Sequence, residues 1–379
     1  MDNLLTERKR IYYLDIARFI AIILVSFNHA VSRSFINYGA FGEQYKEFLR
    51  LSGFESFFKG FMTVISHMGV PLFLMITGAL LLNKKIEDEK DVKRFYKHNL
   101  LSLLITAQIW YFIMYWLVIF GNPEYLEITK NTSFLIIIKD LLKTMLFIEP
   151  ITLGSMWYIP MILCVYLVIP FIALVRNKMS LKIFLPILLI LLFSEMIFIN
   201  YNEFNSLQYK YNFLSTVLEG KNLFSMYFLY IFAGYFIHEG CLKKIPLWVM
   251  LTFFVLGLSA MVGYQCFGYS RLPNFLVHYN FVGMLLVTAA LFELLRRLGE
   301  KVKERKPVTY ISKISFAIYF VHIVIMDPIY WNAKTWLATF TPIGQFFVLE
   351  IISFAGSILI IWLLSKIKVC KKYLFRIKD

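Results

Sequence analysis

The sequence predicts an all-α polytopic membrane protein with about ten transmembrane helices and both termini in the cytoplasm. Three observations lead to this fold class. The 379 residues are 59% hydrophobic and only 17% charged, whereas soluble domains are about a quarter charged. The apolar residues gather into long runs, and Lys and Arg gather in every second connection between these runs. This pattern excludes a soluble enzyme and a disordered chain.

The predicted spans are apolar runs of roughly the 20 residues that a helix needs to cross a bilayer. They lie near residues 12–31, 61–82, 100–120, 157–175, 183–199, 223–238, 246–265, 277–295, 310–328 and 343–364. The run 134–148 contains Lys139, Asp140 and Lys143, and it predicts an amphipathic helix at the membrane interface instead. We expect residues 1–379 to form a single membrane-embedded domain, with spans from about 12 to 364 and no separate soluble domain.

The distribution of basic residues sets the predicted orientation. With the N-terminus inside, 27 of the 39 Lys and Arg residues fall in inner connections, 11 fall in outer ones, and Arg18 lies inside the first span. Cytoplasmic connections of membrane proteins collect Lys and Arg in this way. The same bias accounts for the net charge of +15, so the charge does not indicate a nucleic-acid partner.

The first span contains three polar residues of unusual spacing, Asp15, Arg18 and His29. An Arg or Asp at the middle of a span costs at least about 2.5–3.5 kcal/mol, so such residues mark function or a buried pair. Arg18 and His29 lie eleven residues apart, which is close to three turns and about 16 Å along one helix face. Asp15 lies one turn before Arg18 and can pair with it.

Two interpretations of this stripe are open. In the functional one, the helix lines a tunnel, Arg18 holds an anionic donor, and His29 acts as a general base, since imidazole titrates near neutrality. In the structural one, Asp15 and Arg18 form a pair near the inner interface, and His29 is an outer-interface residue.

Four further segments follow the Arg18-x10-His29 spacing along the chain. They are GVPLFLMITG at Gly69–Gly78, MWYIP at Met156–Pro160, FLYIFAGY at Phe228–Tyr235 and SFAIYFVH at Ser315–His322. Together, in this order, the five segments resemble the acyltransferase-3 family of membrane acyltransferases, whose signature is Arg-x10-His. The resemblance covers the chain from about residue 11 to 364.

The resemblance implies that the chain is an O-acyltransferase in a bacterial plasma membrane, among membrane lipid. Acetyl-CoA from the cytosol would be the donor, no metal would be needed, and the acceptor would be a hydroxyl of a cell-surface or lipid-linked glycan. His29 would take the proton of that hydroxyl, and Asp327, Glu149 and Glu195 are candidates to orient its ring. No spacing of His, Cys, Asp and Glu in the sequence predicts a metal site.

Three alternatives to this function stay open. Two of them lie within the family: another acyl group such as succinyl, or an acceptor that is not a glycan. The third is a transporter or exporter of lipid-linked glycans, because ten spans with buried charges also suit that class. A transporter would often show two repeated halves, and no such symmetry is visible in the sequence.

Further candidate residues lie at both predicted membrane faces. Lys93, Arg94, Lys97 and His98 form a basic cluster before span three that suits the polyanionic donor, although inner connections are basic in any case. Members of the family often have Arg-x-x-Arg there, and in this chain Lys97 takes the place of the second Arg. The positive charge stays, but the planar guanidinium that could bind a phosphate through two hydrogen bonds is lost.

Aromatic and polar residues near the predicted outer face are candidates for the acceptor site. Trp157 and Tyr158 suit stacking on sugar rings, although aromatic residues at span ends are often interfacial anchors. Within the Ser315 segment, Tyr319 and His322 lie one turn apart and would line the cavity, unless the His is simply packed in the core.

Overall fold

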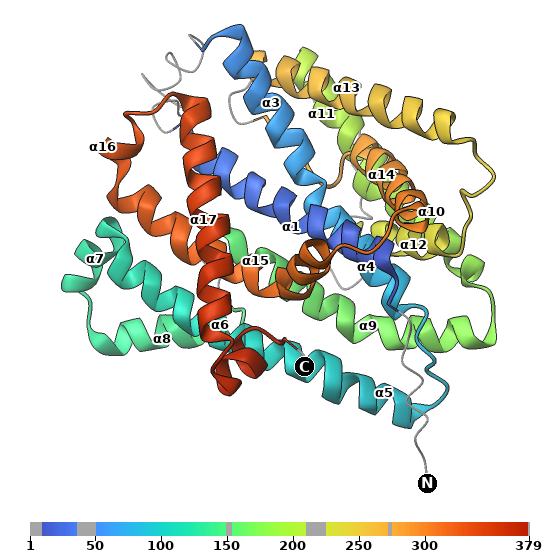
Figure 1. The fold of residues 1–379 in the computed structure, drawn as a ribbon, viewed down its shortest axis with the longest axis horizontal. Helices are drawn as coiled ribbons and strands as arrows, with labels where there is room; N and C mark the ends of the chain where they lie inside the picture. Colours follow the sequence, from blue (N-terminus) through green and yellow to red (C-terminus); the bar gives the residue numbers. More distant parts are fainter. Residues whose placement is uncertain (1–9, 36–50, 149–153, 210–224, 272–274, 378–379) are drawn as a thin grey trace.

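The computed structural model describes residues 10–35, 51–148, 154–209, 225–271 and 275–377, which form a bundle of helices (Figure 1). No strand occurs within these ranges. The α-helices are α1 (Tyr12–Arg33), α3 (Gly53–His67), α4 (Gly69–Leu81), α5 (Glu89–Phe95), α6 (Leu101–Gly121), α7 (Pro123–Lys130), α8 (Phe134–Met145), α9 (Tyr158–Lys178), α10 (Leu185–Leu192), α11 (Phe198–Tyr209), α12 (Tyr227–His238), α13 (Leu247–Arg271), α14 (Val282–Lys301), α15 (Lys306–Asn332), α16 (Lys334–Leu337) and α17 (Pro342–Leu364).

The predicted all-α membrane class is confirmed. Among the described residues, eight helical segments are long and apolar enough to cross a membrane. They are Tyr12–Arg33, Gly53–Leu81, Glu89–Gly121, Tyr158–Lys178, Leu181–Asn205, Leu247–Arg271, Lys306–Asn332 and Pro342–Leu364. The other two predicted spans fall on α12, which has 12 residues, and on α14, whose second half is charged.

The second predicted span begins earlier than its apolar run. Its first helix, α3, begins at Gly53, because Ser52 and Glu55 form a capping box. In this motif each of the two side chains accepts a hydrogen bond from the backbone N–H of the other residue. The segment 134–148 forms the separate helix α8, which lies against α6 through the hydrogen bond from Tyr115 Oη to the Ile137 carbonyl (2.9 Å).

Helix α1 runs through the middle of the bundle and packs against α3, α4, α14, α15 and α17 (Figure 1). The closest crossing in the bundle is that of α4 with α12. A Cβ atom on Gly78 would lie 1.8 Å from the Ile231 carbonyl oxygen, and one on Gly234 would lie 2.2 Å from the Met75 carbonyl oxygen. Small residues at such crossings let two membrane helices approach closely.

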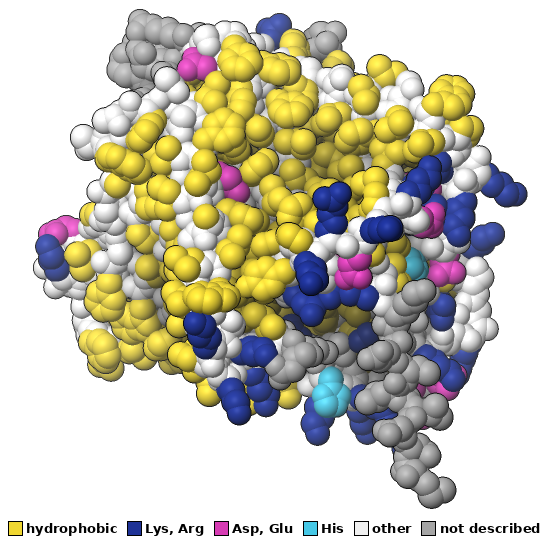
Figure 2. All heavy atoms as spheres, viewed as in Figure 1, with side chains coloured by type: hydrophobic (Ala, Val, Ile, Leu, Met, Phe, Trp, Pro, Cys, Tyr) yellow, Lys and Arg dark blue, Asp and Glu magenta, His cyan; other side chains and the backbone are white. Residues whose placement is uncertain are grey.

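Charged side chains gather at one end of the bundle, as Figure 2 shows beside a large hydrophobic face. This basic end is formed by the beginnings of α1, α5 and α15 and by the ends of α4, α9, α12, α14 and α17. Contacts tie its parts together: Arg176 donates to Asn83 Oδ1 (2.8 Å), and Arg297 donates to the Leu242 carbonyl (2.8 Å). The opposite end is called the outer end below.

Candidate active site

The polar residues at the beginning of α1 form a buried ionic network. Asp15 is 3% exposed. It forms an ion pair with Arg10 and accepts a hydrogen bond from Ser312 Oγ (2.7 Å) of α15. The predicted pairing with Arg18 is present at 3.6 Å, but Arg10 is the closer partner. Arg10 therefore neutralises much of the charge of Asp15, and the Arg18 guanidinium stays available to a ligand.

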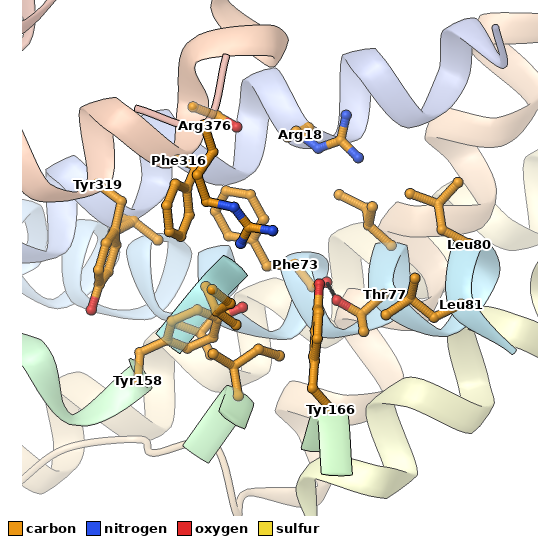
Figure 3. Close-up of a pocket in the computed structure, with 16 residues that line it drawn as sticks. Arg18, Phe73, Thr77, Leu80, Leu81, Tyr158, Tyr166, Phe316, Tyr319 and Arg376 are labelled. Atoms are coloured by element: carbon orange, nitrogen blue, oxygen red, sulfur yellow. Dashed lines mark hydrogen bonds between the residues drawn. The ribbon is translucent and has the colours of Figure 1, made fainter. Parts of the chain in front are cut away.

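Arg18 opens into an inner cavity of about 190 Å³. Its side chain is 27% exposed and donates to Ser312 Oγ (3.2 Å). The cavity walls are mostly apolar and come from α1, α4, α6, α9, α15 and the C-terminal segment; they include Arg18, Phe73, Thr77, Tyr158, Tyr166, Ser315, Phe316, Tyr319 and Arg376. Figure 3 shows Arg18 and Arg376 reaching into this space from α1 and from the C-terminal segment, across from Tyr158 and Tyr166 of α9.

His29 lines a second cavity, of about 550 Å³, near the outer end. We call it the outer cavity; its walls are Asn28, His29, Ser32, Arg33, His67, Trp157, Tyr227, Leu276, His278 and Tyr279. Aromatic rings and polar groups both line this space, which is a typical lining for a small-molecule site. His278 lies in the connection between α13 and α14, and burial lowers the pKa of its ring.

The ring of His29 is held between a cation and a second histidine. Arg33 Nη1 lies 3.3 Å from His29 Nδ1, and Arg33 forms an ion pair with the buried carboxylate of Asp327 on α15. A guanidinium only donates, so Nδ1 of His29 acts as an acceptor in this contact. Of the three candidates to orient the ring of His29, Asp327 is thus connected to it through Arg33, a residue that the sequence pattern did not single out.

His322 lies beside His29, behind the outer cavity. The two ring centroids are 5.3 Å apart, and His322 is fully buried. Its Nδ1 hydrogen-bonds to the Ile318 carbonyl (2.7 Å), while its Nε2 has no partner among the described residues. Since a carbonyl only accepts, Nδ1 carries the proton and Nε2 presents a lone pair.

Aromatic rings separate the two cavities. Tyr158 and Tyr319 lie on the inner side with ring centroids 5.7 Å apart, and Trp157 lies on the outer side, 6.3 Å from Tyr158. The sequence predicts one shared passage for Arg18 and His29, whereas the structure places these residues on one stripe of α1 but in two cavities. Bulky rings at the boundary account for the difference.

A third cavity, of about 950 Å³, lies at the basic end. This basic cavity is lined by His98, Ser102, Phe316, Ser365, Lys366, Lys368, Lys371, Lys372, Arg376 and Ile377. Of the basic cluster predicted before span three, His98 lines it. Arg94 and Lys97 are exposed and line none of the three cavities, and Arg94 pairs with Asp91 (3.4 Å).

The described contacts of Glu195 and Ser315 are with groups other than His29. Glu195 accepts a hydrogen bond from the backbone N–H of Met226 (2.7 Å), and Glu149 lies outside the described residues. Ser315 lines the inner cavity and donates to the Ser312 carbonyl (2.9 Å).

Comparison with known proteins gives one family. The model of the family Acyl_transf_3, described as an acyltransferase domain, matches residues 11–362. No curated protein and no solved structure matches the chain significantly.

Proposed function

This chain belongs to the Acyl_transf_3 family of acyltransferases, and from that premise we propose that it transfers an acetyl group from cytosolic acetyl-CoA to a hydroxyl of a cell-surface or lipid-linked glycan. One observation carries the proposal. A single face of α1 presents Arg18 to the inner cavity and His29 to the outer cavity, with aromatic rings between the two. This layout suits a reaction whose donor and acceptor arrive from opposite membrane faces.

The basic end supports a cytoplasmic position for the donor entrance. Lys and Arg concentrate on the cytoplasmic side of membrane proteins, and in this chain they gather at the basic end (Figure 2), where five of them line the basic cavity. We place the chain in a bacterial plasma membrane with this end, and so both termini, in the cytoplasm. The outer cavity then opens toward the surface glycan.

The proposed chemistry needs a base at His29. A sugar hydroxyl is a weak nucleophile, so its proton must be removed as its oxygen attacks the thioester carbonyl carbon. The new C–O bond forms, the C–S bond breaks, and CoA leaves as a thiol with the proton that His29 took. In the neutral ring, Nδ1 holds the lone pair and lies 3.3 Å from Arg33 Nη1, so the guanidinium must move off this nitrogen for it to take the proton. Arg33 then suits the negative charge that develops on the carbonyl oxygen.

The outer cavity suits a sugar acceptor. Trp157 and Tyr279, whose ring centroids are 5.3 Å apart, give it flat apolar walls. Asn28, Ser32 and His67 line the same cavity and give it hydrogen-bonding groups. A sugar ring combines an apolar face with hydroxyls along its edge and is complementary to such a surface.

Transfer of radiolabelled acetyl groups tests the function. The full chain, reconstituted in nanodiscs with acetyl-CoA and oligosaccharides from the host surface polysaccharide, is expected to yield labelled ester on the sugar. If transfer from succinyl-CoA is faster, the transferred group is succinyl and not the proposed acetyl. No transfer from either donor to any glycan, with folded protein, would contradict the proposal.

Arg18→Ala is expected to raise the KM for acetyl-CoA by about tenfold to a hundredfold, because it removes a charge-assisted hydrogen bond to the donor. Arg18→Lys is expected to restore part of this loss, since the charge remains while the planar fork is lost. Steady-state kinetics check both. Arg305→Ala, at an exposed position of the basic end, is the matched control. An unchanged KM in folded Arg18→Ala protein would remove the donor role of this residue.

A further inference from the structure

The C-terminal segment after α17 builds most of the basic cavity. Residues 365–377 supply seven of its ten lining residues, and the other three are His98, Ser102 and Phe316. Five of the lining side chains are cations, Lys366, Lys368, Lys371, Lys372 and Arg376, and among the described residues no carboxylate lines this cavity. Like charges around one concavity repel each other, so the surface favours an anionic ligand.

This segment is fixed to the bundle. Phe375 is 1% exposed and packs against Trp110 of α6, with ring centroids 6.5 Å apart. The indole Nε1 of Trp110 donates to the Leu374 carbonyl (2.9 Å). Arg376 has a φ of 51°, which is a left-handed conformation that non-glycine residues adopt rarely. These contacts hold the Arg376 side chain between the basic and inner cavities, both of which it lines.

Some exposed lysines of the basic end are neutralised by a nearby carboxylate, whereas the lysines of the cavity that follow are not. Lys85 pairs with Glu87 (3.1 Å), and Lys93 pairs with Glu89 (2.5 Å). In the described part of the chain, Lys366, Lys368 and Lys372 have no carboxylate partner. Lys366 instead lies over the Trp362 ring (3.9 Å).

Arg376 is the deepest cation of the set. Its guanidinium lies over the Phe316 ring, 5.5 Å from the centroid, and has no carboxylate partner among the described residues. Burial lowers the pKa of Arg376, which reflects the unfavourable removal of an unpaired cation from water. An anion bound in the cavity would offset this penalty.

The basic and inner cavities adjoin, because Phe316 and Arg376 line both. A wide cationic cavity thus lies next to a narrow, mostly apolar cavity that Arg18 lines. Coenzyme A has the same division: a nucleotide head with a 3′-phosphate and a diphosphate, about four negative charges, and a long uncharged arm that ends at the sulfur.

We propose that the C-terminal segment, through Lys366, Lys368, Lys371, Lys372 and Arg376, binds the phosphate groups of coenzyme A, with the pantetheine arm in the inner cavity. This inference rests on the proposed function, from which the identity of the ligand is taken. Anionic lipid headgroups share the phosphate chemistry, so the experiment separates the two sources.

Direct binding tests the inference apart from turnover. Coenzyme A and 3′-dephospho-coenzyme A are titrated by calorimetry into the full chain in nanodiscs of phosphatidylcholine alone. The variant Lys366→Gln/Lys368→Gln/Lys371→Gln/Lys372→Gln is compared with Lys178→Gln/Lys182→Gln/Lys301→Gln/Lys303→Gln. The control removes the same charge from lysines that are exposed and line none of the described cavities.

We expect the Kd for coenzyme A to rise about tenfold or more in the cavity variant and to change less than about twofold in the control, because several charge-assisted contacts are lost together. Wild-type protein is expected to bind the dephospho compound more weakly than coenzyme A. The KM for acetyl-CoA should rise in parallel with the Kd in the cavity variant, while kcat is kept.

Each other outcome has a defined meaning. Wild-type binding with an unchanged Kd in the cavity variant overturns the inference and leaves the proposed function intact. The titrations are repeated in nanodiscs that contain anionic lipid. If the cavity variant and the control differ in Kd only in those nanodiscs, the lysines bind lipid headgroups, and the inference is also overturned. If wild-type protein neither binds coenzyme A nor uses acetyl-CoA, the proposed donor itself is wrong.

Arg376→Ala, with Arg376→Lys as its conservative partner, repeats the test at the junction of the two cavities.

Discussion

Replacement of His29 by Ala is expected to lower kcat for acetyl transfer by about 10²–10⁴-fold, the usual contribution of a general base. The affinity for coenzyme A should stay within about twofold of the wild-type value, because His29 lines the outer cavity and the donor site lies beyond the aromatic boundary. Radiolabel transfer and calorimetry measure the two quantities on the same nanodisc preparation.

Chemical rescue separates the loss of a base from the loss of structure. The space left by the His29 ring adjoins the outer cavity, so added imidazole is expected to restore part of the activity of His29→Ala. Imidazole should not restore Arg18→Ala, whose defect lies in the inner cavity. Activity of His29→Ala within tenfold of wild type would show that another group takes the proton.

Gly234→Ala is expected to destabilise the folded protein by about 1–3 kcal/mol or more, the range for overpacking a tight contact. The added Cβ would lie 2.2 Å from the Met75 carbonyl oxygen and 2.4 Å from Met75 Cα, so backbone atoms block it. Helices α4 and α12 would have to move apart, and both belong to the packed centre of the bundle. Gly78→Ala should act in the same way from the other helix.

Gly263→Ala in α13 is the matched control, because no atom lies within 4 Å of a Cβ at that position. Alanine is the better helix former, so this variant should be as stable as the wild type or more stable. Thermal unfolding of detergent-purified protein compares the two substitutions. Equal midpoints for Gly234→Ala and Gly263→Ala would show that the close crossing does not limit stability.

These glycines give a physical meaning to two of the segments that resemble the family. Gly78 ends the GVPLFLMITG segment, and Gly234 lies within FLYIFAGY. In the structure these two segments cross each other, and each glycine faces the backbone of the other helix. Their residue pattern thus reflects helix packing beside the inner cavity.

The fold was largely predictable because its signals are local. Apolar runs and the bias of Lys and Arg are read within single segments, and α1, α9 and α17 begin and end within a few residues of the predicted spans. The exceptions have identifiable causes. Helix α3 begins earlier because of its capping box, and α12 has 12 residues because the helix that the structure describes begins at Tyr227, four residues after the start of the predicted span.

The site was less predictable because its contacts join distant segments. Arg33 and Asp327 pair across 294 positions of the sequence, and no local pattern connects them. Arg376 is one of many basic residues near the C-terminus, and its entry into the inner cavity depends on the fold of the residues around Phe375. The predicted donor contacts at Arg94 and Lys97 followed the charge pattern, which marks the basic end as a whole, and in the structure these two side chains line none of the three cavities.

The central claim is that donor and acceptor reach α1 from opposite ends, and transfer across a sealed membrane tests it most directly. Vesicles that expose only the basic end are loaded with acceptor oligosaccharide, and labelled acetyl-CoA, which does not cross the bilayer, is added outside. Labelled ester is expected on the enclosed oligosaccharide and not on oligosaccharide added outside. Label only on the sugar that shares the donor's compartment would contradict the account.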